Sequence, residues 1–459
     1  MKVAGVRVRF GTLLYVLVED AVILGLLLGA FAFADFGQLD VLHSPLGLVN
    51  AILLMLGFKA VFFWAGLYDF RHLPDRRTFW KRLGFGLALV SVAAYVLWVW
   101  VAGEGIACAA FLIAVIPLIV LGRLLYEYVS RARRFRKRLL FMGIGQQSQR
   151  TAREILDLCS RDFEIVGFLA EKNDELGWRL GGRNVLGTYA DLEPVVAVQK
   201  VDQVVVAVPD RRKNMPLDEL LRVRLRGVEI VDEEHVHEEI AGKIPVEDLR
   251  PSWLIFSKGF ASSPLRHGTK RFFDIVVSVI GLVLSAPLML LTAIAIRLES
   301  KGPVIFRQER VGQGGDVFTL CKFRSMRVDA EAGGTPTWAQ KEDPRVTRIG
   351  RFIRKTRLDE IPQMWNVLQG RMSFVGPRPE RPFFVEKLRE KIPFYDQRHA
   401  VKPGITGWAQ VRFRYGSDET DAVEKLRHDM FYIKHQSILF DMRILLETVR
   451  VVFERDKGR

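Results

Sequence analysis

Four long apolar stretches fill the first quarter of this chain of 459 residues, at about 12–34, 46–68, 83–102 and 105–127. A helix of roughly 20 apolar residues crosses a hydrocarbon core of about 30 Å, and each stretch is long enough to do so. We therefore predict four transmembrane helices. The first stretch has no small-residue cleavage site after a short apolar core, which indicates an anchor and not a removed signal peptide.

The segments that join these stretches differ in charge. Lys and Arg are frequent between the second and third stretches (71–82) and after the fourth (131–138), and both are absent from 35–45 and 103–105. Because basic loops stay in the cytoplasm, both ends of the predicted bundle face that side. Everything after Arg131 then starts in the cytoplasm.

Composition agrees with a membrane protein of several domains. Apolar residues make up 49% of the chain, and the formal net charge is +15. Because the cations flank apolar runs, we assign this charge to contact with lipid headgroups and not with nucleic acid. The three cysteines, Cys108, Cys159 and Cys321, are widely separated and form neither a disulfide framework nor a metal-binding pair.

Short β-rich runs alternate with helical runs between about 138 and 260. This alternation is typical of a parallel sheet with crossover helices, so we predict a Rossmann-like α/β domain over 131–262. The expected strands are 139–143, 164–170, 201–208 and 227–231, and the expected helices are 148–159, 192–198 and 217–224.

The first turn of this domain, Gly143-Ile-Gly145-Gln-Gln-Ser148, begins like a dinucleotide-binding fingerprint. Ser148 stands where the third glycine belongs, and the nearest candidate for the ribose-binding acid, Asp174, comes a few residues late. A regulatory or structural domain therefore fits better than a working NAD site.

A fifth apolar segment, 275–296, is interrupted by Ser285-Ala-Pro287. A proline inside a helix removes a hydrogen bond and clashes with the preceding turn, so we expect a break near Ser285. Cations stand on both sides of the segment, at His267, Lys270, Arg271, Arg297, Lys301, Arg307 and Arg310. Since both ends should then stay in the cytoplasm, we predict a re-entrant helix over 272–298 with its hinge at Ser285 and Pro287. A kinked spanning helix is the alternative.

Two adjacent carboxylates, Asp359 and Glu360, follow a basic run that begins at Arg354. Apolar residues at helical spacing and the stop signal at Gly370 predict a helix from about 360 to 369, which places Asp359 at or next to its N-cap. The positive end of a helix suits both an ionised carboxylate and an incoming phosphate. The simpler interpretation is that Asp359 only caps the helix and Glu360 is solvated.

Several strings around this pair resemble the bacterial sugar transferases, the monotopic phosphoglycosyl transferases that use polyprenyl phosphate. The resemblance runs in order from about Lys270 to the C-terminus. The strings are Glu309-Arg-Val-Gly-Gln-Gly-Gly315, Lys322-Phe-Arg-Ser-Met326, Asp343-Pro-Arg-Val-Thr-Arg-Ile-Gly350, Gly370-Arg-Met-Ser-Phe-Val-Gly-Pro-Arg-Pro-Glu380 and Pro403-Gly-Ile-Thr-Gly-Trp-Ala-Gln-Val411.

The resemblance implies that a sugar-1-phosphate passes from a UDP-sugar to polyprenyl (undecaprenyl) phosphate through an aspartyl-phosphosugar on Asp359, with release of UMP. Such a reaction starts assembly of an exopolysaccharide, capsule or O-antigen repeat unit. Glu360 completes the catalytic pair, and both carboxylates are expected to hold Mg²⁺. The expected phosphate-binding residues are Lys322, Arg354, Arg378, Arg412 and Arg414.

The predicted fold is a membrane protein of mixed α and α/β structure. It consists of a four-helix transmembrane bundle (1–130), the Rossmann-like accessory domain (131–262) and a mainly α catalytic domain (263–459). We expect it in the bacterial inner membrane, with the catalytic domain on the cytoplasmic face, and the bundle and accessory domain offer surfaces for a homo-oligomer. Two other functions are alternatives: a membrane-anchored NAD-dependent nucleotide-sugar dehydratase or epimerase, which needs an intact fingerprint and a Tyr-x-x-x-Lys, and a non-enzymatic scaffold for polysaccharide export.

Overall fold

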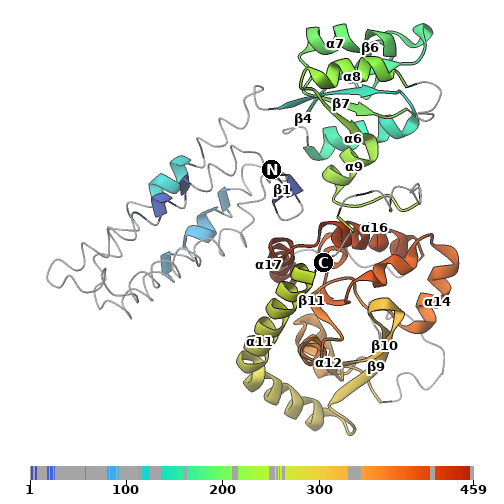
Figure 1. Cartoon of the computed structure of the whole chain (residues 1–459). Coiled ribbons are helices and arrows are strands. Elements are labelled where there is room, and N and C mark those ends of the chain that lie inside the picture. Colours follow the sequence, from blue (N-terminus) through green and yellow to red (C-terminus); the bar gives the residue numbers. More distant parts are fainter. Residues whose placement is uncertain are drawn as a thin grey trace. The chain divides into compact units, whose positions relative to one another are not determined.

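The computed structural model describes residues 136–159, 163–208, 215–247, 254, 257, 259–260, 264–328, 343–413 and 419–454, with scattered positions before 136. Contacts divide the chain into two compact units, Arg7–Ala241 and Gly242–Arg459 with Lys2–Val6, and each is described by itself (Figure 1). Two short strands near the start are β1 (Lys2–Val3) and β2 (Val6–Arg7). Most of the four predicted transmembrane stretches lies outside the described residues, so the bundle stays a prediction.

The first unit contains a six-stranded sheet in the order β5-β6-β4-β3-β7-β8. All neighbouring strands are parallel except β5 and β6. The strands are β3 (Lys137–Met142), β4 (Phe163–Ala170), β5 (Arg179–Leu180), β6 (Arg183–Thr188), β7 (Gln203–Val206) and β8 (Glu229–Asp232). The helices are α6 (Gln146–Cys159), α7 (Leu192–Gln199), α8 (Leu217–Leu225) and α9 (Glu233–Ala241). The predicted Rossmann-like sheet is confirmed, and β5, β6 and α9 are additions that the sequence pattern did not reveal.

Alternate side chains of β3 enter two separate cores, because successive residues of a strand point to opposite faces. Leu139 and Phe141 pack with residues of α6 and α9, whereas Leu140 and Met142 pack with residues of α7 and α8. The sheet is therefore covered by helices on both faces, which explains why its central strands read as continuous apolar runs.

The second unit contains α11 (Pro264–Glu299), a helix of 36 residues with Pro287 inside it. The predicted break is a bend and not an interruption, because the backbone is helical throughout and Figure 1 shows two arms that meet at an angle. The helix is long and apolar enough to cross a membrane, and only 11% of its most apolar stretch is buried. Its large exposed side chains include Phe272, Val283 and Leu298. An apolar surface of this length on a soluble protein would be unusual.

The rest of the second unit consists of strands, helices and 3₁₀ turns around a large core, and a smaller buried cluster contains Ile296, Phe323 and Ile353. Strands β9 (Ile305–Val311) and β10 (Val317–Phe323) form an antiparallel hairpin, and β11 (Ser373–Val375) and β12 (Gly404–Thr406) pair in parallel. The α-helices are α12 (Arg348–Lys355), α13 (Gln363–Leu368), α14 (Pro382–Lys391), α15 (Trp408–Arg412), α16 (Glu419–His435) and α17 (Ile438–Glu454). Shorter 3₁₀ turns are η4 (Gln313–Gly315), η5 (Leu358–Glu360) and η6 (Tyr395–Ala400).

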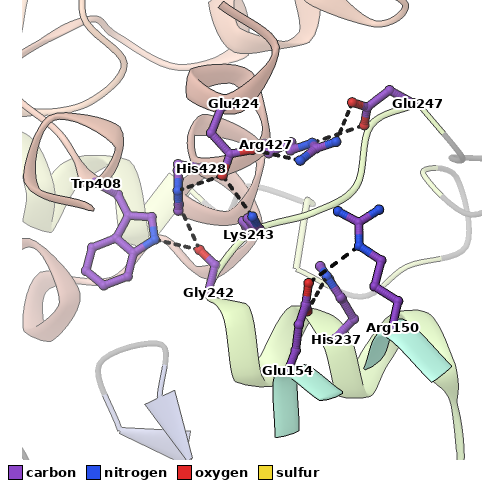
Figure 2. A network of polar contacts seen from close by, with 10 residues as sticks. All are labelled: Arg150, Glu154, His237, Gly242, Lys243, Glu247, Trp408, Glu424, Arg427 and His428. Atoms are coloured by element: carbon purple, nitrogen blue, oxygen red, sulfur yellow. Dashed lines mark hydrogen bonds and ion pairs between the residues drawn. The ribbon is translucent and has the colours of Figure 1, made fainter. Parts of the chain in front are cut away.

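The segment directly after α9 packs within the second unit. The Gly242 carbonyl accepts a hydrogen bond of 2.7 Å from Trp408 Nε1, and Lys243 pairs with Glu424 at 2.9 Å (Figure 2). Ile244 and Val246 are fully buried in the same core. This unit therefore begins before residue 263, the start expected for the catalytic domain, and the outer domain limits stay predictions.

Gly404→Ala is expected to destabilise the second unit, because an added Cβ would lie 2.1 Å from the backbone nitrogen of Gly376. Backbone atoms cannot give way as a flexible side chain can, so we expect a loss of about 1–3 kcal/mol. The midpoint of thermal unfolding measures it. Gly268→Ala in α11 is the control, because no atom beyond its neighbours in the same helix backbone lies within 4 Å of its added Cβ. Equal midpoints for both variants would contradict this packing.

Candidate active site

Asp359 and Glu360 lie in η5, between α12 and α13. The predicted helix over 360–369 is wrong at its start: α13 begins at Gln363 with Pro362 as its N-cap. Hydrogen bonds between residues three apart, such as Glu360 N–H to Arg357 O, close a 3₁₀ turn first. Asp359 therefore does not cap α13. Burial, and not the dipole of this helix, is the main influence on its carboxylate.

Arg357, the residue before η5, has a left-handed backbone with φ +60°. Such a conformation is unfavourable for a residue with a Cβ, and it turns the chain out of α12. The Arg357 guanidinium donates to Glu360 Oε1 at 3.0 Å, and Arg378 Nη2 donates to the same oxygen at 2.9 Å. Glu360 is thus held between two arginines and is not the solvated residue of the simpler interpretation.

Asp359 has a different environment from its neighbour. It is 8% exposed, and its Oδ1 is buried without a hydrogen-bond partner among the described residues. Burial, with a smaller contribution from the charge of Glu360, raises the pKa of Asp359 to about 6. Burial alone would also raise the pKa of Glu360, but Arg378 and Arg357 outweigh it and lower that pKa. The Glu360 carboxylate therefore accepts two hydrogen bonds, whereas Asp359 Oδ1 accepts none among the described residues.

Lys322 on β10 belongs to the same cluster. Its Nζ lies 5.2 Å from the centre of the Phe306 ring, its cross-strand partner on β9. Burial, with the positive charges of Arg310, Arg378 and Arg354, lowers the pKa of Lys322 to about 8, while Asp359 opposes this shift. Of the five phosphate-binding candidates, Arg354 and Arg378 are therefore close enough to Lys322 to affect its charge.

The loop that carries Arg378 is fixed from two sides. Arg310 on β9 donates to the Pro379 carbonyl at 3.0 Å, and Arg398 in η6 donates to the Arg378 carbonyl at 3.1 Å. The flanking Pro377 and Pro379 restrict the backbone further. The Arg378 side chain itself remains 40% exposed, so a guanidinium on a rigid loop faces Glu360 and can still meet a ligand.

The remaining candidates lie elsewhere. The Arg412 guanidinium lies 4.3 Å from the centre of the Trp408 ring and 3.6 Å from Glu447 Oε1 on α17. Arg414 lies outside the described residues. Ser285 and Pro287 lie within α11, where the Ser285 hydroxyl donates to the Leu282 carbonyl at 3.5 Å. The roles of all four stay predictions.

Sequence reasoning did not single out Arg357, Arg398 or Asp429. Arg357 stands three residues before Glu360, a spacing at which side chains on one turn can meet, so this signal was present. Arg398 and Asp429 form a buried ion pair with 2.9 Å between Nη2 and Oδ2, but 31 residues separate them. No local pattern connects residues that far apart.

The carboxylate pair can be tested for a metal. Within the described part of the chain, no group of three or more His, Cys, Asp or Glu side chains could hold one. Mg²⁺, however, takes one or two protein carboxylates and completes its shell with water and substrate phosphates. Asp359 contributes a buried oxygen that lacks a hydrogen-bond partner in the described structure, with Glu360 beside it. These two residues fit Mg²⁺ that binds together with a phosphate substrate.

The fold and the site define a mixed α/β protein in which the described residues include a long apolar helix and a carboxylate pair set among cations. A family model described as bacterial sugar transferase matches residues 265–455, and one described as a CoA-binding domain matches 64–223. An exopolysaccharide production protein (PSS) of Rhizobium leguminosarum is 42% identical over 197 residues, which are 41% of this chain and 97% of that protein. The chain belongs to the bacterial sugar transferase family.

Two longer relatives extend the match. A UDP-N-acetylgalactosamine-undecaprenyl-phosphate N-acetylgalactosaminephosphotransferase of Aeromonas hydrophila is 43% identical over 51% of this chain and 54% of its own length. An undecaprenyl-phosphate glucose phosphotransferase of Komagataeibacter xylinus is 33% identical over 74% of this chain and 65% of its own length. The chain thus covers between half and two thirds of these two relatives.

Arg357→Gly and Arg357→Ala should differ in stability although both remove the same guanidinium. Only glycine adopts φ +60° without a Cβ clash, so we expect the glycine variant to be more stable by about 1 kcal/mol. The same pair of substitutions at exposed Arg351 inside α12 is the control, where alanine should be the more stable by about 1 kcal/mol. Thermal unfolding midpoints measure both differences. The same order at both positions would contradict the left-handed turn.

Proposed function

We propose that this protein transfers a sugar-1-phosphate from a UDP-sugar to undecaprenyl phosphate. The observation that carries the proposal is the carboxylate of Asp359: its Oδ1 is buried without a hydrogen-bond partner among the described residues, and the positive charges of Lys322, Arg357 and Arg378 act on it. The printed names of two relatives, a glucose and an N-acetylgalactosamine phosphotransferase that act on undecaprenyl phosphate, support the same reaction class. The donor is then a UDP-hexose.

In the first step, Asp359 attacks the phosphorus that carries the sugar. A bond forms between the carboxylate oxygen and this phosphorus, and the bond from phosphorus to the bridging oxygen breaks. UMP leaves with that oxygen and its electron pair, and an aspartyl-phosphosugar remains. The cations Lys322, Arg354 and Arg378 allow a carboxylate to approach a diphosphate, because they offset the repulsion between two anions.

Glu360 has a supporting role in this step. Its contacts with Arg357 and Arg378 hold its charge in place, so it cannot compete as a nucleophile. Asp359 and Glu360 would hold Mg²⁺, which supplies charge neutralisation at the diphosphate when it is bound. Arg378 links the pair to the substrate, because one guanidinium can contact both Glu360 and a phosphate oxygen.

In the second step, a phosphate oxygen of undecaprenyl phosphate attacks the same phosphorus. The acyl–phosphate bond breaks, Asp359 regains its carboxylate, and undecaprenyl-diphosphate-sugar leaves. The two steps share one site and form a ping-pong mechanism. This product starts a repeat unit of an exopolysaccharide, capsule or O-antigen.

The membrane arrangement in this proposal follows from substrate access. A UDP-sugar is soluble and undecaprenyl phosphate stays in the bilayer, so the site must lie at the cytoplasmic surface of the inner membrane. The bent α11, with exposed apolar side chains along it, supports a re-entrant hairpin with its hinge at Ser285 and Pro287. The four N-terminal apolar stretches would anchor the chain, and the α/β unit would be a regulatory or structural module.

Asp359→Asn should abolish UMP release from UDP-sugar in the presence of membranes and undecaprenyl phosphate. The amide cannot act as the nucleophile, so we expect a loss of at least about 10³-fold. Donor labelled at the sugar should leave a hydroxylamine-sensitive adduct on the wild type and none on the variant. Asp396→Asn is the matched control: its exposed pair with Arg389 contributes little, so activity should stay within about twofold. UMP release by Asp359→Asn at the wild-type rate would refute the proposal.

The re-entrant arrangement predicts that both ends of α11 are reached from the same side. In a variant whose native cysteines are replaced, His267→Cys and Lys301→Cys should react with an impermeant maleimide only after the cells are opened. Both positions are exposed. Gln38→Cys, in the predicted external loop, should react in intact spheroplasts and serves as the control. Labelling of one end of α11 in intact spheroplasts would favour a kinked spanning helix instead.

A further inference from the structure

A buried ion pair lies directly beneath the loop that carries Arg378. Arg398, in η6, is 5% exposed, and Asp429, on α16, is 2% exposed. Arg398 Nη2 donates to Asp429 Oδ2 at 2.9 Å, and its Nη1 donates to the Tyr395 hydroxyl at 2.6 Å. An isolated buried guanidinium would be very unfavourable, so Asp429 and Tyr395 together fix both its charge and its orientation.

The same guanidinium reaches the backbone of the loop. Arg398 Nη2 donates to the Arg378 carbonyl at 3.1 Å, the residue whose side chain donates to Glu360 at 2.9 Å. One planar group therefore connects a carboxylate on α16 with the backbone of an arginine that contacts the carboxylate pair. A lysine ammonium is a point charge and does not reproduce this fork.

We propose that Arg398, oriented by Asp429, is a positioning residue for Arg378 in the transfer reaction. This inference rests on the proposed function. Arg398 touches no reacting atom; it holds the Arg378 backbone so that the side chain meets Glu360 and the donor diphosphate in one conformation. A buried ion pair is weak evidence for a role in stability, because well-packed apolar residues often serve as well. A contact that fixes the reactive loop explains why the charged pair is there.

Helix α16 offers a matched control for this pair. Glu424, on the same helix, pairs with Lys243 at 2.9 Å and with Arg427 at 2.7 Å, on the side that faces the segment after α9 (Figure 2). Glu424→Gln therefore removes a carboxylate charge from α16 without touching Arg398 or the Arg378 loop. A purely structural role of charge on this helix would affect Glu424→Gln and Asp429→Asn alike.

The kinetic test uses the full chain in membranes and follows UMP release. In a ping-pong mechanism, kcat/KM for the UDP-sugar reports the first step alone. We expect Arg398→Lys and Asp429→Asn to lower it roughly 10- to 100-fold, and Glu424→Gln to leave it within about twofold. Arg398→Lys added to Arg378→Ala should cause no further loss, because the residue that Arg398 positions is then gone. If the losses in kcat/KM of Arg398→Lys and Arg378→Ala multiply in the double variant, the proposal is overturned.

A second measurement does not depend on activity. Two backbone hydrogen bonds flank Arg378: Gly404 N–H to the Pro377 carbonyl and Val311 N–H to the Glu380 carbonyl, both 2.9 Å. If Arg398 holds this loop, amide exchange at Gly404 and Val311 should be about tenfold faster in Arg398→Lys and unchanged in Glu424→Gln. Unchanged exchange in Arg398→Lys would overturn the positioning role. Absence of UMP release by the wild type would instead refute the proposed function. The amide-exchange measurement would still decide whether Arg398 positions the loop.

Discussion

The Glu360 carboxylate, shared between the guanidinium groups of Arg357 and Arg378, is the contact on which the site depends. Adjacent carboxylates normally repel and compete for the same partners. Here both cations bind one member, so the pKa of Glu360 falls while burial raises that of Asp359. Arg378 is the larger of the two charges that lower the pKa of Glu360, and Arg357, three residues before Glu360 and left-handed in its backbone, supplies the second guanidinium.

The apolar helix α11 is hydrogen-bonded to the two helices that flank the carboxylate pair. Near the start of α11, Arg271 donates to the Leu368 carbonyl at the end of α13, the helix that follows the pair, at 2.7 Å. At the end of α11, Glu299 accepts the backbone N–H of Arg348 at 2.7 Å, in the first turn of α12, the helix that precedes the pair. Both ends of α11 therefore contact the helices on either side of Asp359. These contacts hold the Asp359 carboxylate at a set position relative to the exposed apolar side chains of α11, which favour contact with lipid.

The parts of this structure that follow local patterns could be predicted, and the parts that depend on distant contacts could not. The strands of the α/β unit were predictable because apolar runs bounded by turns indicate buried parallel strands, whereas β5 is only two residues long and gives no such signal. The carboxylate pair and Lys322, Arg354 and Arg378 came from motifs within the chain. The start of α13 was predicted too early, because the spacing of apolar residues does not reveal the left-handed turn at Arg357. The Arg398–Asp429 pair was not predicted, because only the fold brings these two residues together.

Helix α16 connects segments that are far apart in the sequence. Consecutive residues of a helix point about 100° apart, so neighbours can serve different surfaces. His428 Nδ1 lies 3.2 Å from the Gly242 carbonyl in the segment after α9, and Asp429, the next residue, binds Arg398 beneath the Arg378 loop. Gly242 also accepts from Trp408, whose helix α15 directly follows β12, the partner of β11. The segment after α9 and the loop beside the carboxylate pair are therefore both held by one turn of α16.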